Sequence, residues 1–444
     1  MDKKYAAALR EYAPFVQTVG QLLPQADNAH ARVTVQVTAP VLYAYVRSVL
    51  HRAEQKGLKR LYFLARDGYV MLEIAKEIAK VHRIPLELRY LYCSRASLRM
   101  PSYHRISQTE MMDLLLHRGT NLTVLHILER AALSPAQLAQ VLEETGISDP
   151  ASPLSENDFE AVCTQLRGSD AFREAVLENS RAAYADTMAY FRQEGLTDGT
   201  PFGIVDTGWT GSMQRSLRQL SEEIPPVTGF YFGMFARPKS TEDGVYDTWY
   251  FSADSTISVR TKFNNNLFEC LCAAPHGMTT GYRRDAEGHM VPVRRPAEQG
   301  TPMMQTVEAQ ISLCRAFAQR CAALEDAKQF DADRMHRISR RLLQAFMYRP
   351  SAEEAEGFAV FRFCDDVTEA YAASLVQHDC RRILHQHMPH IRILRKLRGM
   401  KPDSELFWSY GTLAVSGLPF QFLYRPALRS WDVIRCILDL CKRN

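Results

Sequence analysis

Residues 202–217 read FGIVDTGWTGSMQRSL, and no other stretch says as much about the fold. An apolar run over residues 202–205 leads to Asp206, a loop rich in glycine and hydroxyl groups follows, and a helical pattern then begins. A strand, a polar loop and a helix start direct several backbone N–H groups toward one spot, with the helix dipole behind them. The alternative is a strand-to-helix turn with a Thr or Ser N-cap. We expect a phosphate at the loop of Thr207, Gly208, Trp209, Thr210, Gly211 and Ser212.

Two earlier segments repeat the pattern of a strand followed by a polar turn. Residues 60–68 combine an apolar run of strand length with an Arg-Asp-Gly turn, and helical spacing follows. Residues 86–95 combine a second apolar run with a Cys-Ser-Arg turn. Because ligands bind beyond the carboxyl ends of parallel strands in an open α/β sheet, we expect these turns to surround one crevice. The groups expected there are Arg66, Asp67, Ser94, Arg95 and Asp206.

These motifs resemble those of type I phosphoribosyltransferases. They are more closely similar to a module of bacterial capsule and O-antigen gene clusters that is often fused to a haloacid-dehalogenase-type phosphatase. The motifs lie at residues 63–68, 90–95 and 205–212, and at a Phe-Glu pair, residues 268–269, before residues 274–277 and 281–282. The resemblance covers roughly residues 30–290. It implies an α/β fold with a mostly parallel, Rossmann-like sheet.

The resemblance also implies a donor and a set of roles. The donor is phosphoribosyl pyrophosphate, its 5-phosphate is held by residues 207–212, and Mg²⁺ is held through substrate and water, with Asp67 as the alternative protein ligand. The expected pyrophosphate site consists of Ala65, Arg66, Gly68, Ser94 and Arg95. The expected catalytic residues are Asp67, Asp206 and Glu269. Asp206 would bind the ribose hydroxyls and favour the developing cation, while Asp67 is the first choice for the general base and Glu269 the second.

Three positions depart from the usual type I loop. Two adjacent acids normally follow the strand, whereas Val205 takes the first place here and Asp206 the second. Met213 replaces the final Thr of the loop, and Trp209 stands where a small hydroxyl residue is common. These changes argue against a nucleobase substrate. An aromatic face at Trp209 suits contact with a sugar, although packing is an equal alternative.

The acceptor is expected to contact amide and imidazole side chains. A run of three amides precedes Glu269, and each amide offers two donors and an acceptor for sugar hydroxyls. Helix capping is the plain alternative for such a run. The expected acceptor-binding residues are Asn264, Asn265, Asn266 and His276.

The pattern of strands and helices predicts three regions. Residues 1–100 and 196–290 form the α/β core, with residues 33–37 as a candidate edge strand because apolar and polar side chains alternate there. Residues 101–195 show helical periodicity and form an insertion that either caps the crevice or covers a flank of the sheet. Residues 300–444 form a helical C-terminal region.

The C-terminal region carries a basic amphipathic stretch over residues 381–401. Such a stretch either docks on an anionic membrane surface or forms a solvated face of the domain. The net charge of +4 is too small to predict nucleic-acid binding. Ten scattered cysteines without a CxxC pair, and the lack of a leader or a long apolar run, predict a cytoplasmic protein with reduced thiols.

The sequence therefore predicts transfer of a 5-phosphoribosyl group to a sugar hydroxyl of a capsule or O-antigen polysaccharide, on a lipid-linked acceptor. The Asp-x-Asp at residues 331–333 follows no strand, so a separate phosphatase is expected to remove the 5-phosphate. A phosphohydrolase or nucleotide transferase that uses the same loop is one alternative. A non-catalytic scaffold of the assembly, which has lost one acid, is the other.

Overall fold

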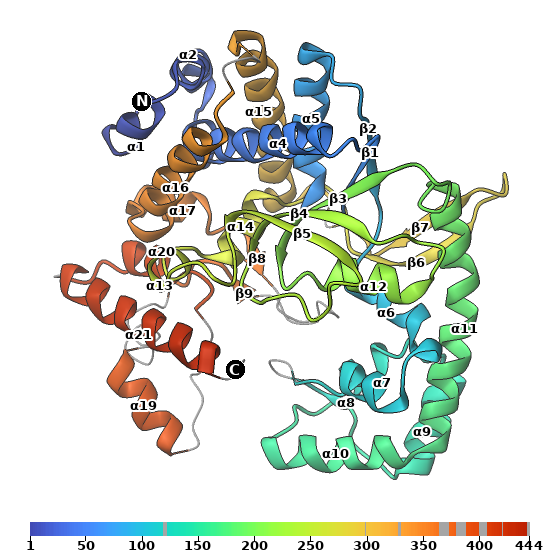
Figure 1. The fold of residues 1–444 in the computed structure, drawn as a ribbon. Helices are drawn as coiled ribbons and strands as arrows, with labels where there is room; N and C mark the ends of the chain where they lie inside the picture. Colours follow the sequence, from blue (N-terminus) through green and yellow to red (C-terminus); the bar gives the residue numbers. More distant parts are fainter. Residues whose placement is uncertain are drawn as a thin grey trace.

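A five-stranded parallel sheet forms the centre of the molecule, with strand order β2-β1-β3-β4-β5 (Figure 1). The computed structural model describes residues 1–118, 122–297, 299–326, 330–363, 373–378, 388–398, 406–419 and 421–441. The strands are β1 (Arg60–Leu64), β2 (Glu87–Leu91), β3 (Phe202–Trp209), β4 (Val227–Met234) and β5 (Gly244–Phe251). The predicted α/β class and parallel sheet are confirmed.

The winding of the chain reverses between β1 and β3. From β1 the chain crosses to β2 on one side, and it then returns to place β3 on the other side of β1. All five residues of β1 are buried, as expected of a strand covered on both faces. Ligands of parallel sheets bind at such a reversal, beyond the carboxyl ends of the two strands.

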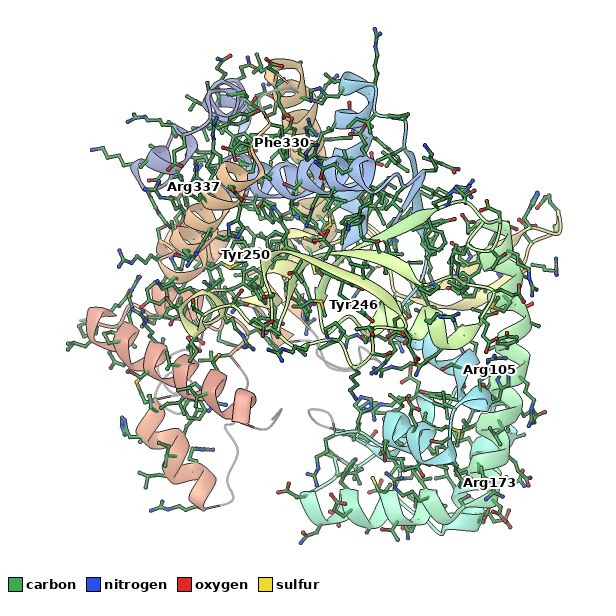
Figure 2. All side chains as sticks on the ribbon, in the orientation of Figure 1. Arg105, Arg173, Tyr246, Tyr250, Phe330 and Arg337 are labelled. Carbon is green, nitrogen blue, oxygen red and sulfur yellow. The ribbon has the colours of Figure 1, made fainter. Side chains whose placement is uncertain are left out.

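Helices cover both faces of the sheet. Leu61 and Phe63 point toward an apolar cluster shared with the N-terminal helices and the C-terminal region. The alternate residues Tyr62 and Leu64 point into a second cluster, shared with the end of α11 and with α12. Figure 2 shows the side chains that fill these spaces, Tyr250 of β5 among them. The helices before β3 are α1 (Lys3–Leu9), α2 (Ala13–Leu22), η1 (Leu23–Gln25), α3 (Ala29–Val33), η2 (Thr34–Thr38), α4 (Ala39–Gln55), α5 (Gly68–His82), α6 (Arg95–Arg99), η3 (Met100–Arg105), α7 (Gln108–Leu115), α8 (Val124–Glu129), α9 (Pro135–Thr145), α10 (Glu156–Gly168) and α11 (Asp170–Gln193).

The edge strand expected at residues 33–37 is wrong, because this segment is helical and η2 is a π-helical turn. All five side chains are buried, so the alternation of apolar and polar residues does not correspond to an inner and an outer face. Within the described residues, only the helical stretch Ala29–Gln55 is long and apolar enough to cross a membrane. Its most apolar 18-residue window is buried inside the protein, as in a core helix.

Among the described residues between β2 and β3, the regular secondary structure consists of helices joined by loops. Helices α7–α10 pack with the start of α11 around an apolar cluster of their own, which includes Leu115, Ile127, Leu166 and Phe172. Figure 1 shows α7–α10 extending away from the sheet. The end of α11 instead covers the sheet, where Phe191 joins the second cluster.

The C-terminal region is continuous with the core of the sheet. The apolar cluster that includes Phe63 also includes Phe346 and the fully buried Trp408. The indole N–H of Trp408 donates to the carbonyl of Met347 at 2.8 Å. The remaining elements are α12 (Ser212–Leu220), α13 (Ile257–Arg260), α14 (Asn265–Leu271), β6 (Thr279–Arg284), β7 (Met290–Arg294), α15 (Pro302–Leu324), α16 (Ala332–Tyr348), α17 (Ala352–Gly357), β8 (Arg362–Phe363), β9 (Ala373–Ser374), α19 (Pro389–Leu397), α20 (Ser409–Val415) and α21 (Gln421–Cys441). Within the basic stretch, Arg381, Arg382 and Lys401 lie outside the described residues.

A buried ion pair joins α4 to the end of α15. Arg47 Nε lies 2.8 Å from Glu325 Oε1, the two side chains are 5% and 0% exposed, and the hydroxyl of Tyr43 also donates to Glu325. We expect Glu325→Ala to lower the free energy of unfolding by about 3–5 kcal/mol, because Arg47 is left buried without its partner. Denaturant titration measures the change.

The exposed pair of Arg237 and Asp254 provides the control, since its side chains are 78% and 65% exposed. Asp254→Ala is expected to cost less than about 1 kcal/mol. The double variant Arg47→Met/Glu325→Leu is expected to recover most of the loss, because both charges are removed together. Equal losses for the buried and exposed pairs would contradict this account.

Candidate active site

Two carboxylates meet where the winding of the sheet reverses. Asp67 follows β1 at the N-cap position of α5, and Asp206 lies in the last half of the adjacent β3. Thr207 Oγ1 donates a hydrogen bond to Asp67 Oδ2 and so ties the two strand ends together. The peptide bond between Ala65 and Arg66 is cis.

A third carboxylate comes from α14. Trp209 Nε1 donates to Glu269 Oε1 at 2.6 Å, and Asn264 caps the start of this helix through a bond from Leu267 N to Asn264 Oδ1 at 2.8 Å. Burial, and then the charge of Asp67, raise the pKa of Asp206 to about 7 and that of Glu269 to about 8. Burial also raises the pKa of Asp67. The site therefore retains protons near neutral pH and favours a positive charge placed among its carboxylates.

Two arginines lie beside the carboxylates. The charges of Arg66 and Arg95 oppose the rise in the pKa of Asp67 and of Glu269, and Arg95 does the same for Asp206. Both side chains are exposed, so an incoming anion can reach them. The structure therefore brings together the two guanidinium groups and the carboxylates that the sequence placed in one crevice.

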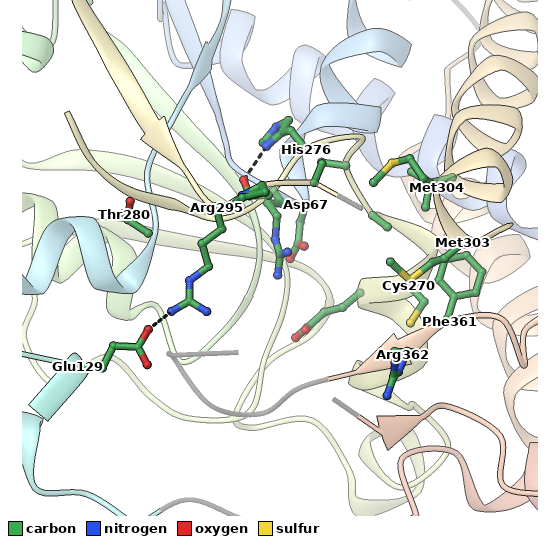
Figure 3. A pocket seen from close by; sticks show the side chains of 18 residues that line it. Asp67, Glu129, Cys270, His276, Thr280, Arg295, Met303, Met304, Phe361 and Arg362 are labelled. Atoms are coloured by element: carbon green, nitrogen blue, oxygen red, sulfur yellow. Dashed lines mark hydrogen bonds and ion pairs between the residues drawn. The ribbon is translucent and has the colours of Figure 1, made fainter. Parts of the chain in front are cut away.

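A cavity of about 690 Å³ opens next to the carboxylates. Arg66, Asp67, Glu269 and His276 contribute to its wall. On one side Arg295 Nη2 lies 2.5 Å from Glu129 Oε1, and the opposite side is apolar (Figure 3). The residues on that apolar side include Met303, Met304, Val307 and Phe361. Glu129 belongs to α8, so the helical insertion reaches the cavity.

His276 is held in a neutral form at the cavity wall. Its Nδ1 lies 3.0 Å from the carbonyl of Gly277 and its Nε2 lies 2.8 Å from the hydroxyl of Tyr90. Burial lowers the pKa of His276. An Nδ1–H that donates to Gly277 leaves Nε2 to accept from Tyr90. The Tyr90 hydroxyl also lies 3.4 Å from the carbonyl of Arg66, and it therefore links His276 to the turn after β1.

The loop expected after Val205 is wrong in its extent, because β3 continues through Trp209. Thr207 is 2% exposed and bonded to Asp67, so its hydroxyl is already in use. The indole of Trp209 packs against Phe235, Phe251, Phe263 and Phe268, which is the packing alternative. Residues 206–212, all of them described, lie outside the lining of the cavity.

The end of this segment retains the geometry of a helix N-terminus. Gly211 precedes α12 with φ = 65°, and no side chain caps the helix. A Cβ at Gly211 would lie 2.5 Å from the ring of Tyr246, so only glycine fits there. Gly208 has φ = 109° and lies against the carbonyl of Gly233, 2.5 Å from where its Cβ would be. The N–H of Thr210 donates to the carbonyl of Gly208 at 3.0 Å, so the uncapped start of α12 at Ser212 is the part of the predicted loop that remains open to a ligand.

Several predicted ligand-binding side chains have structural partners instead. Ser94 caps α6 and donates to the carbonyl of Thr279 at 2.6 Å. Asn264 donates to the carbonyl of Phe407 at 2.7 Å, in addition to capping α14, and Asn265 donates to Asn266 at 2.8 Å. None of these three asparagines lines the cavity described above. Capping therefore accounts for Asn264, whereas His276 lines the cavity and its role toward an acceptor stays a prediction.

Several residues of the cavity wall are not predicted by the sequence. Met303 and Met304 begin α15 and Phe361 precedes β8, far along the chain from the motifs. No local pattern marks them, since Met and Phe at helical spacing normally indicate core. Tyr90 lies within the motif at residues 90–95, and its hydroxyl is a sequence signal for a polar group at this wall. Among the described residues, no group of three or more His, Cys, Asp or Glu side chains is placed to hold a metal ion.

The raised pKa values of Asp206 and Glu269 predict that the stability of the protein depends on pH. The folded protein holds protons on Asp206 and Glu269 that the unfolded chain releases above about pH 4, because burial raises both pKa values. The free energy of unfolding should therefore fall as the pH rises from about 5 to about 8. Urea titrations across this range measure the slope.

Asp206→Asn and Glu269→Gln should each flatten that slope, because neither side chain titrates. The exposed Asp254→Asn provides the control and should follow the wild-type slope. Two neutral variants that keep the wild-type pH dependence would show that these carboxyls titrate normally.

Comparison with known proteins adds no family to these observations. No family model matches the chain, and no curated protein sequence matches it.

Proposed function

We propose that this protein transfers a 5-phosphoribosyl group from phosphoribosyl pyrophosphate to a sugar hydroxyl of a bacterial capsule or O-antigen polysaccharide. The observation that carries the proposal is the trio Asp67, Asp206 and Glu269 beside Arg66 and Arg95, at the point where the winding of the sheet reverses. The arrangement pairs a site for a developing cation with a site for a departing anion.

The reaction breaks the bond between the anomeric carbon and pyrophosphate, which leaves with the electron pair. Arg66 and Arg95 bind the pyrophosphate oxygens, because planar guanidinium groups match phosphate geometry. Asp206 binds the ribose hydroxyls and stabilises the positive charge on the sugar. The acceptor oxygen then bonds to the anomeric carbon from the opposite face, and the product has the β configuration.

The proton of the acceptor hydroxyl goes to a carboxylate at the cavity wall. Thr207, Arg66 and Arg95 all favour the ionised form of Asp67, so Asp67 is the base in this proposal. Glu269, with a pKa of about 8, remains protonated at neutral pH and is the second choice. Mg²⁺ bound to the pyrophosphate would add charge neutralisation there, and Asp67 is the carboxylate best placed to contact it.

Asp67 also accounts for the missing second acid of the type I loop. Val205 is buried in the sheet where that acid would stand, and Asp67 lies close enough to Asp206 to raise its pKa and to supply a partner, while Glu269 in turn lies near Asp67. A scaffold that had lost its chemistry would have no need of three carboxylates whose burial opposes their ionisation. The trio therefore favours the enzyme over the scaffold.

The acceptor occupies the cavity in this proposal. Its apolar side, with Met303 and Phe361, suits the C–H face of a sugar ring, and Arg295 offers a polar contact at the wall. Both ring nitrogens of His276 already have partners, so His276 would contribute through its ring or through the Tyr90 hydroxyl bonded to it. The 5-phosphate remains on the product. Asp331 accepts from Arg334 N at 3.0 Å as the N-cap of α16, so this Asp-x-Asp follows no strand and a separate phosphatase completes the ribose.

The assay uses the purified protein, donor, Mg²⁺ and a panel of synthetic glycans, with product mass as the readout. The expected product is heavier than the acceptor by one phosphopentosyl unit. Asp206→Asn and Asp67→Asn should each reduce turnover by roughly 10²–10⁴-fold, because each removes charge that acts on the transition state. Donor should still raise the melting temperature of both variants.

Asp254→Asn is the matched control and should turn over like the wild type. Wild-type rates in both active-site variants would exclude this mechanism. An unphosphorylated pentosyl product from the purified chain would instead reveal a phosphatase within it. A wild-type protein that binds donor but transfers to no glycan would support the scaffold.

We also propose that the protein is cytoplasmic and touches the inner face of the membrane, where a lipid-linked acceptor would lie. Ile393 and Leu394 of α19 are 47% and 49% exposed beside basic residues, and Leu423 of α21 is 62% exposed. Arg392 lies 4.5 Å from the ring centroid of Trp431 and so joins α19 to α21. Exposed apolar side chains among cations suit an anionic lipid surface.

Co-sedimentation with phosphatidylglycerol-containing vesicles tests this contact. Binding should weaken at high salt and with neutral vesicles, because the attraction is partly electrostatic. Ile393→Glu with Leu394→Glu should reduce binding about tenfold or more. Val81→Glu, at an exposed apolar residue of α5, should not. Equal binding by all variants would exclude this surface.

A further inference from the structure

A buried glutamine of α15 holds the end of the helix that carries Glu269. Gln310 is 0% exposed, and its Nε2 donates to the carbonyl of Cys270 at 3.2 Å and to that of Leu271 at 2.9 Å. These two residues follow Glu269 directly and end α14. The last carbonyls of a helix find no N–H partner within that helix, so the amide of Gln310 supplies donors at this end.

The start of α14 and the side chain of Glu269 are also held. Asn264 caps the start of the helix, and Trp209 Nε1 donates to Glu269 Oε1 at 2.6 Å. The helix has only seven residues, so little of it lies between its two ends. With Gln310 at the end nearer to Glu269, these contacts leave α14 little freedom to shift.

A histidine of α3 fixes the orientation of the Gln310 amide. His30 Nε2 lies 3.1 Å from Gln310 Oε1, and both side chains are buried. Because carbonyls only accept hydrogen bonds, the amide nitrogen of Gln310 faces Cys270 and Leu271 and its oxygen faces His30. Nε2 of His30 then carries the proton. Burial lowers the pKa of His30 to about 4, so the ring is neutral at pH 7 and this tautomer provides the bond.

The helix that carries Gln310 also forms part of the apolar side of the cavity. Met304 and Val307 line the cavity from α15, and they share a helix face with Gln310 because the three are spaced three residues apart. Figure 3 shows Met304 and Phe361 on this side of the cavity. His30 packs against Phe361, with ring centroids 5.6 Å apart. Gln310 and His30 therefore tie α14 to the wall that the acceptor contacts in the proposed function.

We propose that Gln310 is a positioning residue for Glu269, and that His30 orients its amide. Gln310 does not line the cavity, so it acts through α14 and not by contact with a substrate. By holding the end of this helix, it keeps the Glu269 carboxyl group against Trp209 and away from water. The part that Glu269 takes in a reaction rests on the proposed function, whereas its positioning by Gln310 does not.

The variant Gln310→Met tests the positioning on the full chain, without donor or glycan. Methionine keeps the length of the side chain but has no N–H group, so α14 loses this support. A Glu269 carboxyl group that can reach water loses the rise in its pKa that burial causes. The slope of the free energy of unfolding between about pH 5 and 8 should then become about half as steep, since one of two raised carboxyls no longer contributes.

Urea titrations separate positioning from a contribution to stability alone. A purely structural role would lower the free energy of unfolding equally at every pH and would leave the slope unchanged. In a Glu269→Gln background, Gln310→Met should have no further effect on the slope, because residue 269 no longer titrates. The charged and titratable groups that face Glu269 are the same in all these variants. They are Asp67, Arg66, Arg95 and the thiols of Cys270 and Cys272.

Gln319→Met is the matched control, because Gln319 lies exposed on the same helix. This variant should follow the wild-type slope. His30→Phe is a milder change, since phenylalanine fits the aromatic neighbours Phe358 and Phe361 and leaves both bonds from the Gln310 amide in place. It removes only the partner of the amide oxygen, and it should flatten the slope less than Gln310→Met does.

Turnover is a second readout, and it rests on the proposed function. Gln310→Met should reduce turnover about tenfold to hundredfold while donor still raises the melting temperature, because a displaced carboxyl affects the reaction more than donor binding. Folded Gln310→Met protein with the wild-type slope would overturn the positioning. If Gln310→Met does not fold, a wild-type slope in His30→Phe would overturn it instead. A wild-type protein that modifies no glycan would contradict the proposed function, and a flattened slope in Gln310→Met would still support the positioning.

Discussion

The proximity of Asp67, which follows β1, to Asp206 of β3 and to Glu269 of α14 is the constraint on which the rest of the site depends. Burial opposes the ionisation of all three carboxyls, and the charge of Asp67 adds to this effect at Asp206 and at Glu269, so the carboxylates need fixed donors or nearby cations. Thr207 and Trp209 provide the donors, one for Asp67 and one for Glu269.

The backbone of β3 is shaped to supply these donors. Trp209 has φ = 66°, which is uncommon for a residue other than glycine, and Gly208 before it approaches the carbonyl of Gly233 closely. The aromatic residues around the indole, Phe235 and Phe251 among them, hold this conformation by packing. The aromatic residue that departs from the type I pattern is thus the one that fixes the third carboxylate.

Segments that are distant in the sequence meet at the cavity. Glu129 comes from the insertion, Arg295 follows the β6–β7 hairpin, and Met303 begins α15. Because the C-terminal helices share an apolar core with the sheet, their position relative to the carboxylates is fixed by packing.

The sequence by itself determined the strands and the meeting of their ends. A continuous apolar run before Asp67, and another before Asp206, predict adjacent parallel strands, and parallel strands place their carboxyl ends at one edge. The tertiary structure alone decided that β3 extends to Trp209 and that residues 33–37 are helical, because pairing with β4 and burial on all sides override the local pattern. It alone decided that Trp209 donates to Glu269, that Asn264 also donates to the carbonyl of Phe407 and that Arg47 pairs with Glu325, since these contacts link segments between which no spacing rule exists.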